Sequence, residues 1–104
     1  MSVVRILVVE DFAPFRIFIA EMLATRPDLQ IIGEVSDGLE AVHQALELRP
    51  DLILMDIGLP SLNGIEAARE IHKLAPESKI IFLTQESSAD TVREAHKLGA
   101  WGTS

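Results

Sequence analysis

The sequence predicts an α/β protein in which helices cover both faces of a parallel sheet, because short apolar runs alternate with segments of helical spacing. The runs are continuous and rich in β-branched residues, which is typical of strands buried on both faces. They cover Val3–Val9, Ile31–Val35, Leu52–Met55 and Ile80–Leu83. This alternation indicates three layers joined by right-handed crossovers.

The segments after these runs have apolar residues at helical intervals, which predicts four helices that each bury one face. In chain order, the expected buried positions are Phe15, Ile19, Met22 and Leu23; Leu39, Val42 and Leu46; Ile65, Ala68, Ile71 and Leu74; and Val92, Ala95 and Leu98. Turn and cap residues mark the helix ends. In the same order they are Pro14; Asp37 with Glu40, and Arg49–Pro50; Asn63 and Pro76; and Ser87 or Ser88 with Gly99. A fifth strand is expected to start around Trp101.

Length and composition limit the kind of protein. A chain of 104 residues makes one domain, and its 16 acidic and 9 basic side chains give a net charge of −7. An acidic surface repels a phosphate backbone, which argues against direct contact with nucleic acid. Cysteine is absent, so disulfides and thiolate metal sites are excluded. The apolar runs are too short for a membrane span, and the N-terminus lacks the features of a secretion signal, so a cytoplasmic protein is expected.

Polar residues follow three of the apolar runs, where the carboxyl ends of parallel strands form one edge of the sheet. They are Glu10 and Asp11 after the first run, Asp56 after the third and Thr84 at the end of the fourth. Each has an ordinary alternative, since Asp11 fits a helix cap, Thr84 a turn and Asp56 a loop. Together they predict a ligand site at this edge.

The expected cluster of carboxylates needs a positive charge, because two carboxylates 4 Å apart repel by about 4 kcal/mol at an effective dielectric constant near 20. Oxygen ligands without nearby histidine or cysteine favour Mg²⁺. A carboxylate is also a nucleophile that can form an aspartyl phosphate, and a threonine hydroxyl can donate to phosphoryl oxygens. Neither Gly-rich phosphate motif occurs, and Glu10-Asp11-Phe12-Ala13 fits neither an FMN phosphate loop nor the Asp-x-Asp pair of an aspartyl phosphatase.

Five motifs occur along the chain in a fixed order. They are VVRILVVED after the N-terminus, PDLILMDIGLP around Asp56, NGIEAAREI in the third helix, IIFLT ending at Thr84, and HKLGAWG after the fourth helix. Over essentially its whole length the chain therefore resembles the receiver domain of bacterial two-component response regulators, with a CheY-like fold. The stretch LPSLNGIEAAREI is most similar to LuxR-type regulators, whose receivers usually precede a helix-turn-helix DNA-binding domain. The resemblance implies a doubly wound, flavodoxin-like sheet with strand order 2-1-3-4-5.

The resemblance also implies a role for each site residue. Asp56 would accept a phosphoryl group from a phosphohistidine of a sensor kinase, in a transfer that the domain itself catalyses, followed by slow autodephosphorylation. Asp11 would bind Mg²⁺ directly, Glu10 mainly through water, and Gly58 through its backbone carbonyl. Thr84 would contact the phosphoryl oxygens and move inward. This movement would shift an output surface on the fourth helix and fifth strand, and so regulate transcription.

The sequence departs from the family pattern near its C-terminal end. Gln85 follows Thr84 where the family usually has a small residue, and Thr103 stands where an aromatic residue is common. The family's lysine is expected three residues after Thr103, beyond Ser104, so residues 1–104 are expected to be a receiver that lacks the end of its fifth strand, its fifth helix and an effector domain. These departures leave a second hypothesis open, a pseudo-receiver that binds a partner without phosphoryl transfer.

The first helix carries more apolar residues than one buried face needs, because Phe18 adds to the stripe that contains Phe15, Ile19 and Met22. Without a fifth helix, part of this stripe is expected to be exposed. Two such exposed side chains would cost about 3–6 kcal/mol, at about 1.5–3 kcal/mol each. The chain is therefore expected to be a marginally stable monomer or to cover this face by forming a homodimer.

Overall fold

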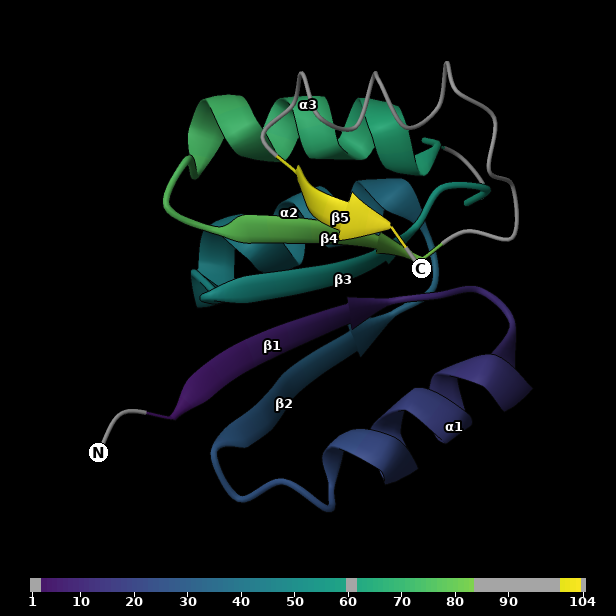
Figure 1. Ribbon diagram of the computed structural model, residues 1–104. Coiled ribbons are helices and arrows are strands. Elements are labelled where there is room, and N and C mark those ends of the chain that lie inside the picture. Colours follow the sequence, from purple (N-terminus) through teal and green to yellow (C-terminus); the bar gives the residue numbers. More distant parts are fainter. Residues whose placement is uncertain (1–2, 60–61, 84–99, 104) are drawn as a thin grey trace.

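A computed structural model describes residues 3–59, 62–83 and 100–103, the last of these as a backbone strand alone. Strands and helices alternate along the chain, as the sequence predicts (Figure 1). The strands are β1 Val4–Val9, β2 Leu29–Val35, β3 Leu52–Asp56, β4 Lys79–Leu83 and β5 Ala100–Thr103. The helices are α1 Ala13–Leu23, α2 Gly38–Leu48 and α3 Gly64–Leu74. The predicted fourth helix lies outside the described residues.

The five strands form one parallel sheet in the order β2-β1-β3-β4-β5, which confirms the predicted fold class and strand order. The fifth strand begins at Ala100, one residue before the predicted start, and Thr103 pairs with Phe82 of β4. All the strand arrows in Figure 1 point the same way, so the carboxyl ends share one edge of the sheet. That edge is where the predicted ligand site should lie.

The face of the sheet that carries α2 and α3 holds the main hydrophobic core. Leu7 of β1, Ile53 of β3 and Phe82 of β4 are fully buried there. The two helices contribute small side chains, with Ile71 of α3 the largest fully buried one. Strand residues alternate between faces, so every second residue of the predicted apolar runs packs into this core.

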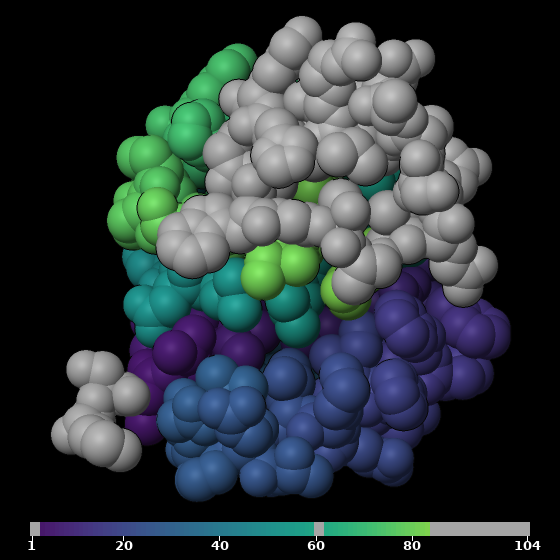
Figure 2. Space-filling view, in the orientation of Figure 1, coloured from purple at the N-terminus to yellow at the C-terminus, as the bar shows by residue number. Residues whose placement is uncertain are grey.

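The opposite face of the sheet is covered by α1, which lies beside β1 and β2 in Figure 1. Ile6, Val8 and Ile19 form a small buried cluster there, and the apolar strand residues around them are only half buried. In the space-filling view the N-terminal elements, coloured purple and blue, form the lower part of the molecule (Figure 2). The sheet is therefore apolar on both faces, as its continuous runs predict.

The predicted helix ends are confirmed at three positions. The carboxylate of Asp37 accepts a hydrogen bond from the Glu40 amide at 2.8 Å, and the Asn63 side chain accepts one from the Glu66 amide at 3.0 Å. Both bonds satisfy amides that have no partner within the helix. Arg49 ends α2 in the left-handed conformation, with φ of 48°.

Several residues predicted to be buried are exposed. On α2, Leu39 is exposed, and Ala41 and Ala45 occupy the buried positions instead. On α3, Leu74 is exposed at the helix end and Ala75 is buried after it. The reason is the same in both helices, because small side chains let the helix backbone approach its neighbours closely. A prediction that ranks buried positions by apolar size overlooks them.

On α1, Ile19 is the residue that the structure buries completely. Phe15 and Met22, which were also predicted to be buried, are exposed, and so is Phe18. This confirms the expectation that part of the apolar stripe on α1 is open. Across the helices that the structure describes, none has the length and apolar character needed to cross a membrane.

Candidate functional site

Three predicted site residues meet at the carboxyl edge of the sheet. Glu10 and Asp11 directly follow β1, and Asp56 is the last residue of β3. These two strands are neighbours, with Val9 of β1 paired to Met55 of β3. One carboxylate oxygen from each acid lies within 4.8 Å of one from each of the others. The pairing of β1 with β3, which is not consecutive in sequence, is what brings the acids together.

Glu10 is the buried member of the cluster, with 4% of its surface exposed. Its backbone amide donates to the Val35 carbonyl of β2 at 3.0 Å, which continues the sheet by one residue. Its carboxylate accepts a hydrogen bond from the Phe12 amide at 3.1 Å. One carboxylate oxygen is therefore occupied within the turn after β1.

Burial and crowding favour the protonated forms of two of these acids. The pKa of Glu10 is raised to about 7, mainly by burial; the hydrogen bond from the Phe12 amide opposes this rise, and the charge of Asp56 contributes to it. Burial also raises the pKa of Asp56, where hydrogen bonding and charge repulsion from Asp11 add to it and the Gly58 amide opposes it. Excess negative charge in a partly desolvated place attracts either a proton or a cation.

The donor set fits Mg²⁺. The three side chains of the cluster offer only carboxylate oxygens, which are hard ligands that suit this ion. In an octahedral Mg²⁺ site, ligand oxygens about 2.1 Å from the metal are about 3.0 Å apart when they are adjacent and about 4.2 Å apart when they are opposite. The three carboxylate oxygens lie within 4.8 Å of one another, and small side-chain rotations would bring them to these separations, because Asp11 is exposed and Asp56 is partly exposed. The residues present therefore pass the test for a magnesium site.

Close backbone contacts flank the loop after Asp56, and at two glycines they leave no room for a side chain. The Gly64 amide at the start of α3 donates to the Ile57 carbonyl at 2.7 Å. A Cβ atom on Gly64 would lie 2.3 Å from the Asp56 carbonyl oxygen, and one on Gly38 would lie 1.7 Å from that of Leu62. Two glycines thus set the path of the loop, one from α3 and one from α2, and the sequence analysis did not single out Gly38.

The remaining predicted site residues are described in part. Gly58 lies on the surface, and its amide is 3.4 Å from Oδ1 of Asp56. Thr84 and Gln85 lie outside the described residues, and Thr103 is described only as part of the β5 backbone. The roles of Gly58 as a carbonyl ligand and of Thr84 as a phosphoryl contact therefore stay predictions.

Arg16, which was not predicted to belong to the site, contacts the backbone of Glu10. Arg16 of α1 donates from a terminal guanidinium nitrogen to the Glu10 carbonyl at 2.7 Å. Its Nε lies 3.6 Å from the Glu34 carboxylate of β2. Position 16 precedes the buried Ile19 by three residues, so it lies on the side of the helix that faces the sheet. A charged residue at such a position was the signal available in the sequence.

Comparison with known proteins gives this arrangement a family. The model of the response regulator receiver domain matches residues 6–103, nearly the whole chain. The chain belongs to the response regulator receiver domain family. This confirms the resemblance drawn from the sequence motifs, and receiver domains are components of two-component signalling.

Individual receiver proteins show the same relationship. Over 100 residues the chain is 47% identical to a protein-glutamate methylesterase/protein-glutamine glutaminase of Thermotoga maritima, covering 94% of this chain and 29% of that protein. It is 40% identical to the transcriptional regulatory protein LiaR of Bacillus subtilis, covering 93% of this chain and 46% of LiaR. A crystal structure of a LuxR-family response regulator from Aurantimonas sp. superposes with a TM-score of 0.92 at 30% identity, covering 98% of this chain and 73% of that one.

The chain spans less than half the length of those two curated relatives. One is an enzyme by name and the other a transcriptional regulator by name, and the part that matches both is a receiver domain in this chain. The LuxR-type resemblance is represented among the similar structures. What a receiver of this kind controls is therefore a separate question from what the receiver does.

Proposed function

We propose that residues 1–104 form the receiver of a phosphorylation-dependent switch, in which Asp56 accepts a phosphoryl group from a phosphohistidine of a sensor kinase. The observation that carries this proposal is the meeting of Glu10, Asp11 and Asp56 at one strand edge, with oxygen atoms within 4.8 Å. Membership of the receiver family supports it. Within the cluster, Asp56 is the acid at the end of β3, and it is partly exposed, so that a donor can reach it.

The proposed reaction is a transfer between two nucleophiles. An oxygen of the ionised Asp56 carboxylate attacks phosphorus, a P–O bond forms, and the P–N bond to the donor histidine breaks. The electron pair of that bond stays on the imidazole nitrogen. The ring is left as neutral imidazole if its other nitrogen already carries a proton, and otherwise it takes one proton from solvent. Glu10, Asp11, Asp56 and the Gly58 carbonyl would hold Mg²⁺, which when bound supplies positive charge against the charge of the phosphoryl oxygens. Thr84 would donate a hydrogen bond to one of these oxygens.

The output is proposed to be regulation of transcription, through a DNA-binding domain of the LuxR type. The similarity to LiaR and to a LuxR-family regulator supports this choice. The similarity to a methylesterase supports a second output, control of an enzymatic domain. In either case the receiver itself would not contact DNA, since its net charge is −7.

Beryllofluoride with Mg²⁺ tests the switch, because it mimics an acyl phosphate on the acceptor carboxylate. We expect it to change the amide spectrum around residues 10–11 and 56–58 and the fluorescence of Trp101, the single tryptophan of the sequence. Asp56→Asn should abolish both responses. A small phosphoryl donor should add one phosphoryl group to the native chain and none to the variant, as measured by mass spectrometry. Mg²⁺ binding without any of these responses would instead support the pseudo-receiver hypothesis.

We also propose that the exposed stripe on α1 makes the chain prone to form a homodimer. Phe15, Phe18 and Met22 are 37%, 55% and 52% exposed and lie on one side of the helix. Exposed apolar stripes of this kind mark association surfaces. Sedimentation across a range of concentrations should detect the dimer, and Phe18→Glu should shift the equilibrium to monomer. A native chain that stays monomeric at all concentrations would contradict this proposal.

A further inference from the structure

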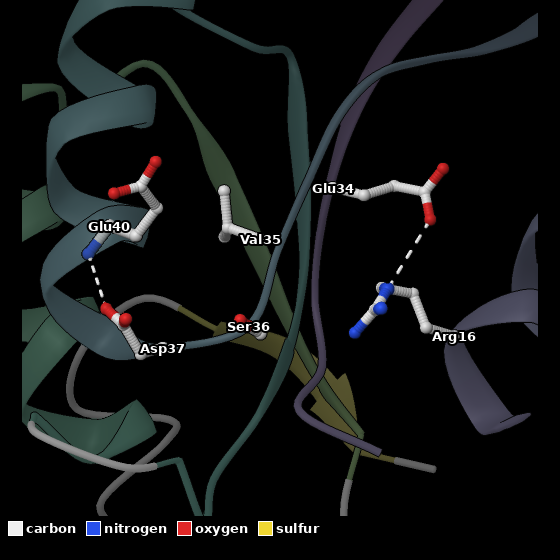
Figure 3. Close-up of a pocket in the computed structure, with 6 residues that line it drawn as sticks. All are labelled: Arg16, Glu34, Val35, Ser36, Asp37 and Glu40. Atoms are coloured by element: carbon white, nitrogen blue, oxygen red, sulfur yellow. Dashed lines mark hydrogen bonds and ion pairs between the residues drawn. The ribbon is translucent and has the colours of Figure 1, made fainter. Parts of the chain in front are cut away.

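Arg16 joins three elements at the site edge of the sheet. Its side chain leaves α1 and reaches the end of β1, where it donates to the Glu10 carbonyl at 2.7 Å. It also reaches β2, where Nε lies 3.6 Å from the Glu34 carboxylate. Figure 3 shows the guanidinium between α1 and Glu34. It lies at one side of a hollow of about 420 Å³, which is also lined by Asp37, the N-cap of α2, and by Glu40 of α2.

With the hydrogen bond from Arg16, the amide, the carboxylate and the carbonyl of Glu10 each have a partner. Its amide is already bound to the Val35 carbonyl and its carboxylate to the Phe12 amide. The Arg16 bond fixes the remaining polar group, the carbonyl, which belongs to the same peptide unit as the Asp11 amide. A guanidinium donates through fixed planar geometry, so it sets the orientation of this peptide more firmly than a flexible ammonium would.

We propose that Arg16 is a positioning residue for the cation site, which holds the peptide between Glu10 and Asp11 so that both carboxylates face Asp56. This inference rests on the proposed function, because it assigns a partner to the same site. Groups that orient metal ligands without touching the metal typically change metal affinity about 10–100-fold when removed. Arg16 acts here through a backbone carbonyl and touches no proposed ligand atom in the described geometry.

A purely electrostatic role for Arg16 predicts the opposite change in Mg²⁺ affinity, so a titration distinguishes the two roles. The Arg16 charge lies close to the acidic cluster and repels a cation, so its removal would strengthen Mg²⁺ binding if charge were its whole effect. Replacement by lysine would then leave binding unchanged. If Arg16 positions the turn, both substitutions weaken binding, because glutamine is shorter than arginine and a flexible ammonium fixes the Glu10 carbonyl less firmly. The hollow beside Arg16 leaves room for either replacement.

The experiment is a calorimetric titration of the native chain, Arg16→Lys and Arg16→Gln with Mg²⁺ alone. We expect both variants to bind about tenfold more weakly or worse. Glu34→Gln is the matched control, because it removes the ion pair and leaves the carbonyl bond in place. Its affinity should change by less than about threefold, since the Glu34 side chain is 43% exposed and its charge is screened. Amide spectra should show changes in residues 10–12 and none in α3.

Each other result overturns the inference in a distinguishable way. Tighter binding by Arg16→Gln with unchanged binding by Arg16→Lys would make Arg16 a charge effect. Equal Mg²⁺ affinity in the native chain and all the variants would show that Arg16 does not position the site, and it would leave the proposed function unaffected. Loss of the folded circular dichroism spectrum in both variants would make Arg16 a structural residue only. Failure of the native chain to bind Mg²⁺ would overturn the proposed cation site itself, and the positioning role with it.

Discussion

The two faces of the sheet are built in different ways. On the face with α2 and α3, the helices press small side chains against the strands, and four of them are fully buried alanines: Ala41, Ala45, Ala67 and Ala68. On the face with α1, Ile19 is the helix residue that is completely buried, and strand residues such as Leu54 and Leu83 are half buried. Close packing and low exposure mark the first face as the stable half of the molecule.

The difference extends to the two sides of the site. Beside the loop after Asp56, Gly38 and Gly64 leave no room for a Cβ atom, and the Gly64 amide donates to the Ile57 carbonyl. The turn that carries Glu10 and Asp11 joins β1 to α1, and hydrogen bonds from Phe12 and Arg16 to Glu10 hold it. One side of the site is therefore tightly packed, and the other is held by hydrogen bonds.

The largest effect should come from a deep residue of the α2 and α3 face. Phe82→Ala should lower the free energy of unfolding by about 3–5 kcal/mol, because Phe82 is fully buried and its removal leaves a cavity. Phe18→Ala on α1 is the matched control. Phe18 is 55% exposed, so its loss should cost about 1 kcal/mol at most, including its stacking on Phe15. Urea denaturation measures both, and equal losses would contradict the proposed asymmetry.

A second pair compares the helices directly. Ile71→Ala in α3 should cost about 2–5 kcal/mol, and Ile19→Ala in α1 should fall at or below the lower end of that range. Both side chains are buried, but the neighbours of Ile19 are mostly half buried and can relax into the space. The two variants share the same chemistry, so a larger loss at Ile19 in denaturant titration would reverse the order of the two faces.

A third comparison tests how tightly the loop after Asp56 is packed. Gly38→Ala should cost about 1–3 kcal/mol, the range for overpacking, because its Cβ would lie 1.7 Å from the Leu62 carbonyl oxygen and the loop must move. Gly58→Ala is the control, since nothing lies within 4 Å of a Cβ there, and its effect should stay within about 0.5 kcal/mol. Thermal unfolding of both variants tests this, and two equal melting temperatures would show that the loop is not clamped.

The smallest effect, when it is expressed per pH unit, is a pH dependence of stability that originates in the turn after β1. The pKa of Glu10 is raised from 4.5 to about 7, so between these values the folded chain binds more protons than the unfolded chain. Stability without divalent cations should therefore fall as pH rises through this window, by less than about 1.4 kcal/mol per pH unit for one group. Denaturation at several pH values with a chelator measures the slope.

Two controls assign that slope to the acidic cluster. Glu10→Gln should flatten it, because the neutral amide does not titrate. Saturating Mg²⁺ should raise stability most at the high-pH end, where the ligands are ionised and binding favours the folded state. A slope that is unchanged in Glu10→Gln would place the titrating group elsewhere.

The sequence predicted the fold and most of the site for specific reasons. Continuous apolar runs indicated a parallel sheet, and the rule that ligands bind at the carboxyl strand ends selected Glu10, Asp11 and Asp56. The prediction of buried residues from the sequence failed where close packing of the helices determines which side chains are buried. Leu39 and Leu74 have the apolar character of buried residues and are exposed, because the helix faces are set by alanines that pack closely.

The sequence by itself determined the kinds of element, their order and the acidic residues at the strand ends, because local periodicity and composition encode these directly. The resemblance to a family implied that β1 lies beside β3, but only the tertiary structure placed carboxylate oxygens of Glu10, Asp11 and Asp56 within 4.8 Å of one another. It also decided the contact of Arg16 with the Glu10 carbonyl. Both depend on residues brought together by packing, and pairwise proximity of that kind leaves no periodic trace in a single sequence.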